Sequence, residues 1–156
     1  MKSGHSLNIA SEADMKQLGL GIGQLLKGGE VLELVGDVGA GKTTFTKGLA
    51  LGMGITEPVQ SPTFTISRLY DTPHGLQLAH YDFYRLQEAG IMSDELVETL
   101  NQPMTVTVVE WAGVVDGVLP EDRLRVEISA TSETDRHVTL TSGGPRSDAV
   151  LTELAK

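Results

Sequence analysis

The octapeptide Gly36-Asp37-Val38-Gly39-Ala40-Gly41-Lys42-Thr43 carries the strongest structural signal in this sequence. It matches the pattern G-x-x-x-x-G-K-[ST] of a phosphate-binding loop, the P-loop. Residues 30–35 before the loop indicate a short strand, and residues 43–51 after it indicate a helix that stops at Gly52 or Gly54. A strand, a glycine-rich turn and a helix in this order are the setting that the motif requires.

The residue types of the loop suit the phosphates of a nucleoside triphosphate with Mg²⁺. Its glycines let the backbone close around a phosphate, so that successive N–H groups form an anion-binding nest at the positive end of the next helix. Lys42 is expected to contact the β- and γ-phosphates, and the Thr43 hydroxyl to ligate Mg²⁺. The nucleotide-binding residues predicted from the loop are Asp37, Val38, Gly39, Ala40, Gly41, Lys42, Thr43 and Thr44. The alternative is a glycine-rich turn with an exposed lysine.

Composition and charge restrict the class of protein. A chain of 156 residues, 40% hydrophobic and 21% charged, is expected to form one soluble domain over residues 1–156. No apolar run approaches the ~20 residues of a membrane span. No signal-peptide core follows the N-terminus and there are no cysteines, so we expect a cytoplasmic protein. The net charge of −9 and the lack of a Lys/Arg-rich stretch argue against tight direct binding of nucleic acid.

The rest of the chain alternates between strand and helix patterns. Strands are expected at residues 7–10, 30–35, 65–70, 76–81, 104–109, 124–129 and 137–141. Helices are expected from the N-cap Ser11 to Leu26, at 43–51, at 94–100 and at 147–155, although Gly19, Gly21 and Gly23 interrupt the first. This order predicts a single-domain α/β protein of the P-loop NTPase fold, with helices flanking a central sheet. Two expected hairpins make that sheet mixed.

Three strand ends are expected to meet at the nucleotide. Ligands bind at the carboxyl ends of strands in open α/β sheets, and Gly36, Asp82 and Glu110 each end a predicted strand. A P-loop NTPase needs a carboxylate near Mg²⁺ at the end of an apolar strand. Glu110 fits this role better, whereas Asp82 would hold a bridging water or orient the attacking water. Either could instead be a surface carboxylate.

Three further side chains are candidates with alternatives. Thr63 lies in a proline-punctuated loop that could respond to the γ-phosphate, or it could stabilise a turn. His80 could be a base, although a histidine near a strand is more often structural. Trp111 could fill the core or cover the site.

The ordered set of motifs resembles the bacterial TsaE family, the ATPase of tRNA threonylcarbamoyladenosine synthesis. The resemblance covers nearly the whole chain. It rests on the P-loop with Thr44-Phe45, then Ser61-Pro62-Thr63-Phe64, His80-Tyr81-Asp82-Phe83-Tyr84-Arg85-Leu86, Val109-Glu110-Trp111 and Leu119-Pro120. It implies slow Mg²⁺-dependent hydrolysis of ATP by a protein that docks on a TsaB–TsaD pair. In that family TsaD transfers threonylcarbamoyl to an adenosine beside the anticodon.

The resemblance also assigns roles to single residues. The catalytic residues that it implies are Asp82, Glu110 and Thr63, and the Mg²⁺ ligands are Thr43 and Glu110. Trp111 would pack beside the site. Ser11 and Arg136 match family positions near the nucleotide more loosely, and the residues themselves favour a helix cap and a strand-end surface charge. The family usually shows a Leu-Gly element where this chain has residues 91–96.

Two other functions use the same fold. A small-molecule kinase needs a lid that carries arginines over the transferred phosphoryl group, and the arginines of this chain are spread along it. A GTP-dependent switch needs a guanine-reading segment like N-K-x-D, which the sequence lacks. The preference for adenine therefore comes from the resemblance alone.

Overall fold

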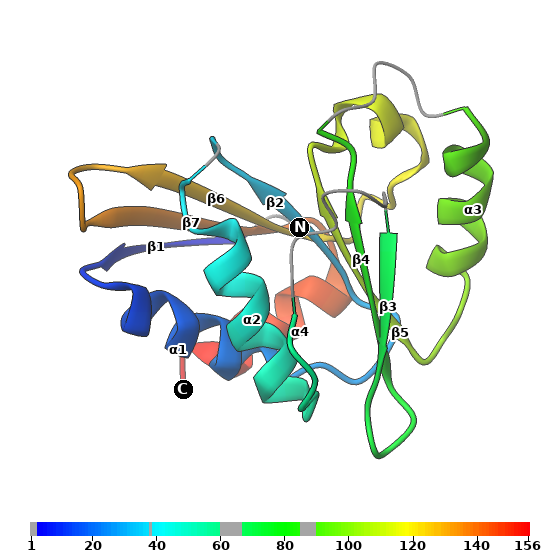
Figure 1. The fold of residues 1–156 in the computed structure, drawn as a ribbon, viewed down its shortest axis with the longest axis horizontal. Helices are drawn as coiled ribbons and strands as arrows, with labels where there is room; N and C mark the ends of the chain where they lie inside the picture. Colours follow the sequence, from blue (N-terminus) through cyan, green and yellow to red (C-terminus); the bar gives the residue numbers. More distant parts are fainter. Residues whose placement is uncertain (1–2, 38, 60–66, 85–89) are drawn as a thin grey trace.

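The computed structural model describes residues 3–37, 39–59, 67–84 and 90–156 (Figure 1). The elements follow one another as β1 (Ser3–Ile9), α1 (Glu12–Gly23), β2 (Val31–Val35), α2 (Lys42–Met53), β3 (Ser67–Asp71), β4 (Gln77–Asp82), α3 (Ile91–Leu100), β5 (Thr105–Glu110), the 3₁₀ helix η1 (Ala112–Val118), β6 (Leu124–Ala130), β7 (Arg136–Ser142) and α4 (Pro145–Leu154). The predicted strands and helices are confirmed wherever the chain is described. The 3₁₀ helix η1 was not predicted, because its short apolar run has no helical period.

The strands form a seven-stranded sheet in the order β1-β7-β6-β2-β5-β4-β3. The four central strands β6, β2, β5 and β4 are parallel. Antiparallel strands extend both sides, with β3 on β4 and β7 and β1 beyond β6. The predicted mixed sheet of an α/β fold is therefore confirmed, and both predicted hairpins are present.

Two apolar layers cover the sheet. Helices α1, α2 and α4 pack on one face, and α3 with η1 packs on the other (Figure 1). The central strand β5 is buried along its whole length, and its side chains alternate between the layers. Val106 and Val108 face α1 and α2, whereas Val109 faces α3 and η1. Since Glu110 follows this alternation, its side chain lies on the α2 side.

The glycines that interrupt the first helical pattern let α1 and α2 touch backbone to backbone. A Cβ on Gly19 would lie 2.2 Å from the carbonyl oxygen of Phe45, and one on Gly48 would lie 2.0 Å from that of Lys16. Gly23 and Gly52 are placed in the same way. Helix α2 continues through Gly52 to Met53, and its C-cap is Gly54, whose φ of 94° suits a glycine. This contact holds the helix that follows the P-loop.

Candidate functional site

The P-loop leads into the start of α2, where backbone N–H groups are available to an anion. Gly39 and Gly41 have φ of 83° and 115°, conformations that favour glycine. The N-cap of α2 is Gly41, and no side chain of the described residues caps this helix end. The N–H groups of the first turn are therefore available to a phosphate. Val38, predicted to bind the nucleotide, lies outside the described residues, as does Thr63.

Lys42 is enclosed between two of the other predicted site residues. Its side chain is only 6% exposed. Its Nζ lies 3.7 Å from Oε1 of Glu110 and 4.0 Å from the ring centroid of Trp111. A cation this close to an indole face and a carboxylate is attracted by both. Lys42 is thus not the exposed lysine of a simple glycine-rich turn.

Glu110 is a buried carboxylate and not a surface one. It is 3% exposed, at the carboxyl end of β5. Its second oxygen, Oε2, lies 2.6 Å from Nε2 of His80. The parallel register pairs Glu110 with Asp82 of β4 and with Leu34 of β2, just before the P-loop. The expected convergence of three strand ends is therefore what the sheet produces.

Asp82 is half-buried at the end of β4, where its Oδ1 accepts a hydrogen bond from the Tyr84 N–H at 3.0 Å. Burial raises the pKa of Asp82 above its ordinary value, and the negative charge of Glu110 raises it further. The Tyr84 N–H and the electrostatic interactions with His80 and Lys42 work in the opposite direction without cancelling the shift. A cation bound beside Asp82 would favour its ionised form.

Trp111 lies beside the site and is not plain core filling. It has φ 57° and ψ 51°, and it is the one non-glycine residue with positive φ in the part of the chain that the structure describes. The left-handed backbone is unusual for a bulky residue and marks sites where a side chain is held in a special direction. The indole contacts Lys42, and its ring centroid lies 4.9 Å from that of Tyr84.

Arg136 supports the P-loop from behind. Its Nε donates to the carbonyl oxygen of Ala40 at 3.0 Å, and its Nη2 donates to that of Gly39 at 3.4 Å. Arg136 stands at a strand end as the sequence predicted, but it is not a free surface charge, because the first residue of β7 lies against the loop. The other loosely matched residue, Ser11, caps α1, where its Oγ accepts from the Asp14 N–H at 3.1 Å.

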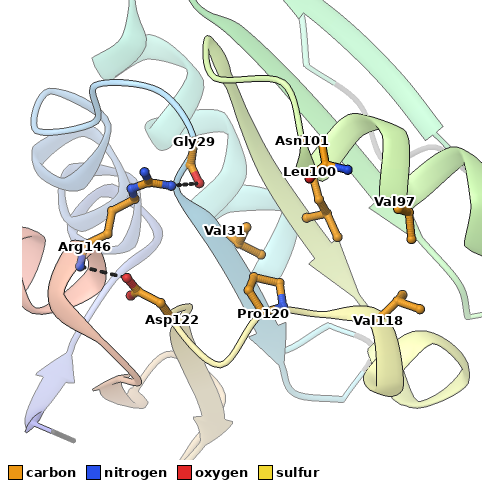
Figure 2. Close-up of a pocket in the computed structure, with 9 residues that line it drawn as sticks. All are labelled: Gly29, Val31, Val97, Leu100, Asn101, Val118, Pro120, Asp122 and Arg146. Carbon is orange, nitrogen blue, oxygen red and sulfur yellow. Dashed lines mark hydrogen bonds between the residues drawn. The ribbon is translucent and has the colours of Figure 1, made fainter.

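A separate pocket of about 260 Å³ lies near the amino ends of β2 and β6, away from the P-loop (Figure 2). It is lined by Gly29, Val31, Val97, Leu100, Asn101, Val118, Pro120, Asp122 and Arg146. Gly29 and Asp122 precede β2 and β6, whereas the P-loop follows β2. This pocket is therefore not part of the candidate site.

The donors at the P-loop suit a magnesium nucleotide better than a preformed metal centre. Within the described ranges, no three His, Cys, Asp or Glu side chains gather as metal ligands. Mg²⁺ in nucleotide sites is usually held by one or two protein oxygens together with phosphates and waters. The hydroxyl of Thr43 and the carboxylate of Glu110 are oxygens of this kind.

None of the described helices has both the length and the apolar content that crossing a bilayer requires.

Fold and loop together define the class, which is a protein of the P-loop NTPase fold. The family model of the threonylcarbamoyl adenosine biosynthesis protein TsaE matches residues 9–138. The chain therefore belongs to the TsaE family, as the sequence motifs predicted.

Individual relatives agree with this assignment. The tRNA threonylcarbamoyladenosine biosynthesis protein TsaE of Bacillus subtilis is 42% identical over 130 residues, which cover 83% of this chain and 80% of the relative. Its namesake in Streptomyces coelicolor is 39% identical over 137 residues, covering 85% and 93%. Among solved structures, YdiB of B. subtilis superposes with a TM-score of 0.82 at 36% identity, covering 99% of this chain and 96% of YdiB.

Proposed function

We propose that this protein binds ATP and Mg²⁺ at the P-loop and hydrolyses ATP slowly, in support of a TsaB–TsaD pair that forms threonylcarbamoyladenosine in tRNA. One observation carries the ATPase part of the proposal. The P-loop lysine, Lys42, lies 3.7 Å from the buried carboxylate of Glu110, and Asp82 is paired with Glu110 across the parallel strands. These are the three kinds of group that a P-loop NTPase brings to the terminal phosphate.

The residues divide the work by position. Lys42 and the free N–H groups at the start of α2 would bind the phosphates. The Thr43 hydroxyl and the Glu110 carboxylate would hold Mg²⁺, which supplies positive charge to the phosphate oxygens. Lys42 is already desolvated, so its contact with a phosphate would be stronger than that of an exposed lysine.

Asp82 is the candidate for handling the attacking water. Its position next to Glu110 leaves it within the site but not on the P-loop. Because burial raises its pKa, it would be a better proton acceptor than an ordinary aspartate. The proposed switch role of Thr63 remains a prediction from sequence.

The partner part of the proposal is supported by the family and by charge. The relatives carry names of threonylcarbamoyladenosine biosynthesis proteins. With a net charge of −9, this chain is poorly suited to hold tRNA itself, which fits a subunit that acts through TsaD and TsaB. Two of the arginines in the described part of the chain have structural contacts that leave them out of a kinase lid, since Arg123 pairs with Glu33 and Arg146 binds the Gly29 carbonyl.

The test is to measure ATP hydrolysis by this protein alone and with the TsaB–TsaD pair of the same organism. We expect slow, Mg²⁺-dependent turnover that rises when the pair is added, together with a complex on a sizing column. An unchanged rate and no complex would contradict the partner role. Phosphoryl transfer from ATP to a small metabolite would instead establish the kinase alternative.

A second measurement separates the two carboxylates. We expect Glu110→Ala to weaken the Mg²⁺ dependence of nucleotide binding more than Asp82→Ala does. The reverse order would exchange their roles.

A further inference from the structure

His80 is a fully buried polar residue that the proposed mechanism does not use. It is 0% exposed in the middle of β4. Val108 lies opposite it on β5, Ala79 precedes it in the chain, and the exposed Arg68 lies opposite it on β3. Burying a polar ring costs free energy that an aliphatic side chain at this position would not cost. Core packing alone therefore does not account for a histidine here.

The two ring nitrogens of His80 have different surroundings. Nε2 lies 2.6 Å from Oε2 of Glu110, and Nδ1 has no hydrogen-bond partner among the described residues. An ionised carboxylate only accepts hydrogen bonds, so toward ionised Glu110 the donor of this contact is the N–H at Nε2 of His80. Within the described part of the chain, the imidazole therefore makes its side-chain hydrogen bond to Glu110.

This contact separates the two oxygens of the Glu110 carboxylate. Oε2 accepts from His80, whereas Oε1 faces Lys42 at 3.7 Å. The terminal torsion of a glutamate is broad, so a carboxylate held at one end alone samples many orientations. A donor fixed in the core of the sheet removes this freedom, and it aims Oε1 at the P-loop.

We propose that His80 is a positioning residue that orients the Glu110 carboxylate for magnesium nucleotide. The inference rests on the role proposed for Glu110. His80 contacts Oε2 of Glu110 and not the Oε1 that faces Lys42, and it would act through that carboxylate. Groups that orient a metal-binding side chain in this way typically contribute roughly 10–100-fold to metal affinity or activity.

The test compares His80→Leu with His80→Gln. Leucine removes the donor and keeps an apolar fill, whereas the glutamine amide can return an N–H near the position of Nε2. Val108→Ala is the matched control, since Val108 is buried opposite His80 and its loss weakens the core without removing a contact of Glu110.

The first readout is the Mg²⁺ concentration that gives half-maximal binding of ATP, followed by Trp111 fluorescence, together with the kcat of the complex with TsaB and TsaD. For His80→Leu we expect a rise in the required Mg²⁺ or a fall in kcat of roughly 10–100-fold. His80→Gln should recover most of the loss, and Val108→Ala should change thermal stability alone. Wild-type behaviour of His80→Leu would overturn the proposal, as would equal losses in all three variants.

The second readout does not depend on activity. Long-range ¹H–¹⁵N NMR spectra of the nucleotide-free protein should show His80 protonated on Nε2, and Glu110→Gln should shift its resonances more than Asp82→Asn does. A His80 signal that is indifferent to Glu110→Gln would overturn the proposal. If the NMR result holds but the wild-type protein shows no Mg²⁺-dependent ATP binding, the proposed function fails and the His80–Glu110 contact stands as a structural one.

Discussion

The pKa values of two aspartates at opposite ends of the parallel strands are shifted in opposite directions. We call the side of the sheet at the carboxyl ends of these strands the carboxyl edge, and the side at their amino ends the amino edge. At the carboxyl edge, burial and the charge of Glu110 raise the pKa of Asp82. At the amino edge, Asp122 accepts hydrogen bonds from the N–H groups of Arg146 and Ser147, both at 2.9 Å, and from the Ser147 hydroxyl at 2.7 Å. Burial works against these bonds, but they and the charge of Arg146 still lower the pKa of Asp122.

The opposite pKa shifts of Asp82 and Asp122 indicate a functional role for Asp82 and a stabilising role for Asp122. Asp122 caps the N-terminus of α4, and every contact that it makes favours its ionised form. At Asp82, by contrast, the favourable contacts do not offset the cost of burying an ionised carboxylate beside Glu110. This arrangement lowers stability, but it is suited to binding a cation and a phosphate. Changes at the carboxyl edge should therefore affect nucleotide handling first, and changes at the amino edge should affect folding first.

The largest effect is expected from Lys42→Ala at the carboxyl edge. Loss of one partner of a desolvated charge contact typically costs roughly 2–5 kcal/mol of binding, or about 30-fold to several thousand-fold in affinity. Calorimetric titration with ATP and Mg²⁺ measures this loss, and circular dichroism checks that the variant is folded. Nearly normal affinity in a folded variant would show that the loop is not the phosphate site.

The close contact between α1 and α2, the helix that follows the P-loop, is tested by Gly48→Ala. The new Cβ would lie 2.0 Å from the carbonyl oxygen of Lys16, so α1 and α2 must move apart. We expect a loss of about 1–3 kcal/mol in the free energy of unfolding, as for other overpacked sites. The matched control is Gly21→Ala, whose Cβ would meet only the Leu154 side chain at 3.7 Å and should stabilise α1. Similar urea midpoints for the two variants would refute the close helix contact.

At the amino edge, Asp122→Ala should lower stability and leave ATP hydrolysis per folded molecule unchanged. Loss of a helix cap costs about 0.5–2 kcal/mol. Because the folded-state pKa of Asp122 is lowered, its contribution is present above the ordinary value of 3.8 and disappears as pH falls through the folded-state pKa. Urea unfolding at several pH values checks this, with the exposed Glu57→Ala as the control. A selective loss of hydrolysis would break the comparison between the edges.

The smallest effect on stability is expected from Asp82→Asn, and it is a gain in stability, whereas Asp122→Ala should cause a loss. The raised folded-state pKa means that the native protein holds this proton more tightly than the unfolded chain, so wild-type stability falls as pH rises from 3.8 through the folded-state pKa. Asparagine removes this penalty. Thermal unfolding without nucleotide should show the variant gaining on the wild type across that window, while hydrolysis is lost. A variant that is less stable at neutral pH would mean that the ionised carboxylate is well compensated.

Local sequence predicted what depends on short-range rules. The P-loop glycines, the strand before them and the helix after them form one continuous segment, and a short pattern of residue types specifies such a segment. The ends of β4 and β5 could also be predicted, because Glu110 follows an apolar run and Asp82 follows the second strand of a predicted hairpin. The cap at Ser11 is a local hydrogen bond and was found in the same way.

Sequence determined the P-loop, the α/β class and the family, because each of these depends on local patterns that do not need the partner strand. Tertiary structure decided which groups meet. The bond of His80 to Glu110 depends on the register of β4 against β5, and the bonds of Arg136 to the loop depend on residues about a hundred positions apart. In the sequence, Gly19 and Gly23 interrupt a helical pattern, and in the fold they permit the close contact of α1 with α2. Contacts between distant segments follow from packing, which no local pattern encodes.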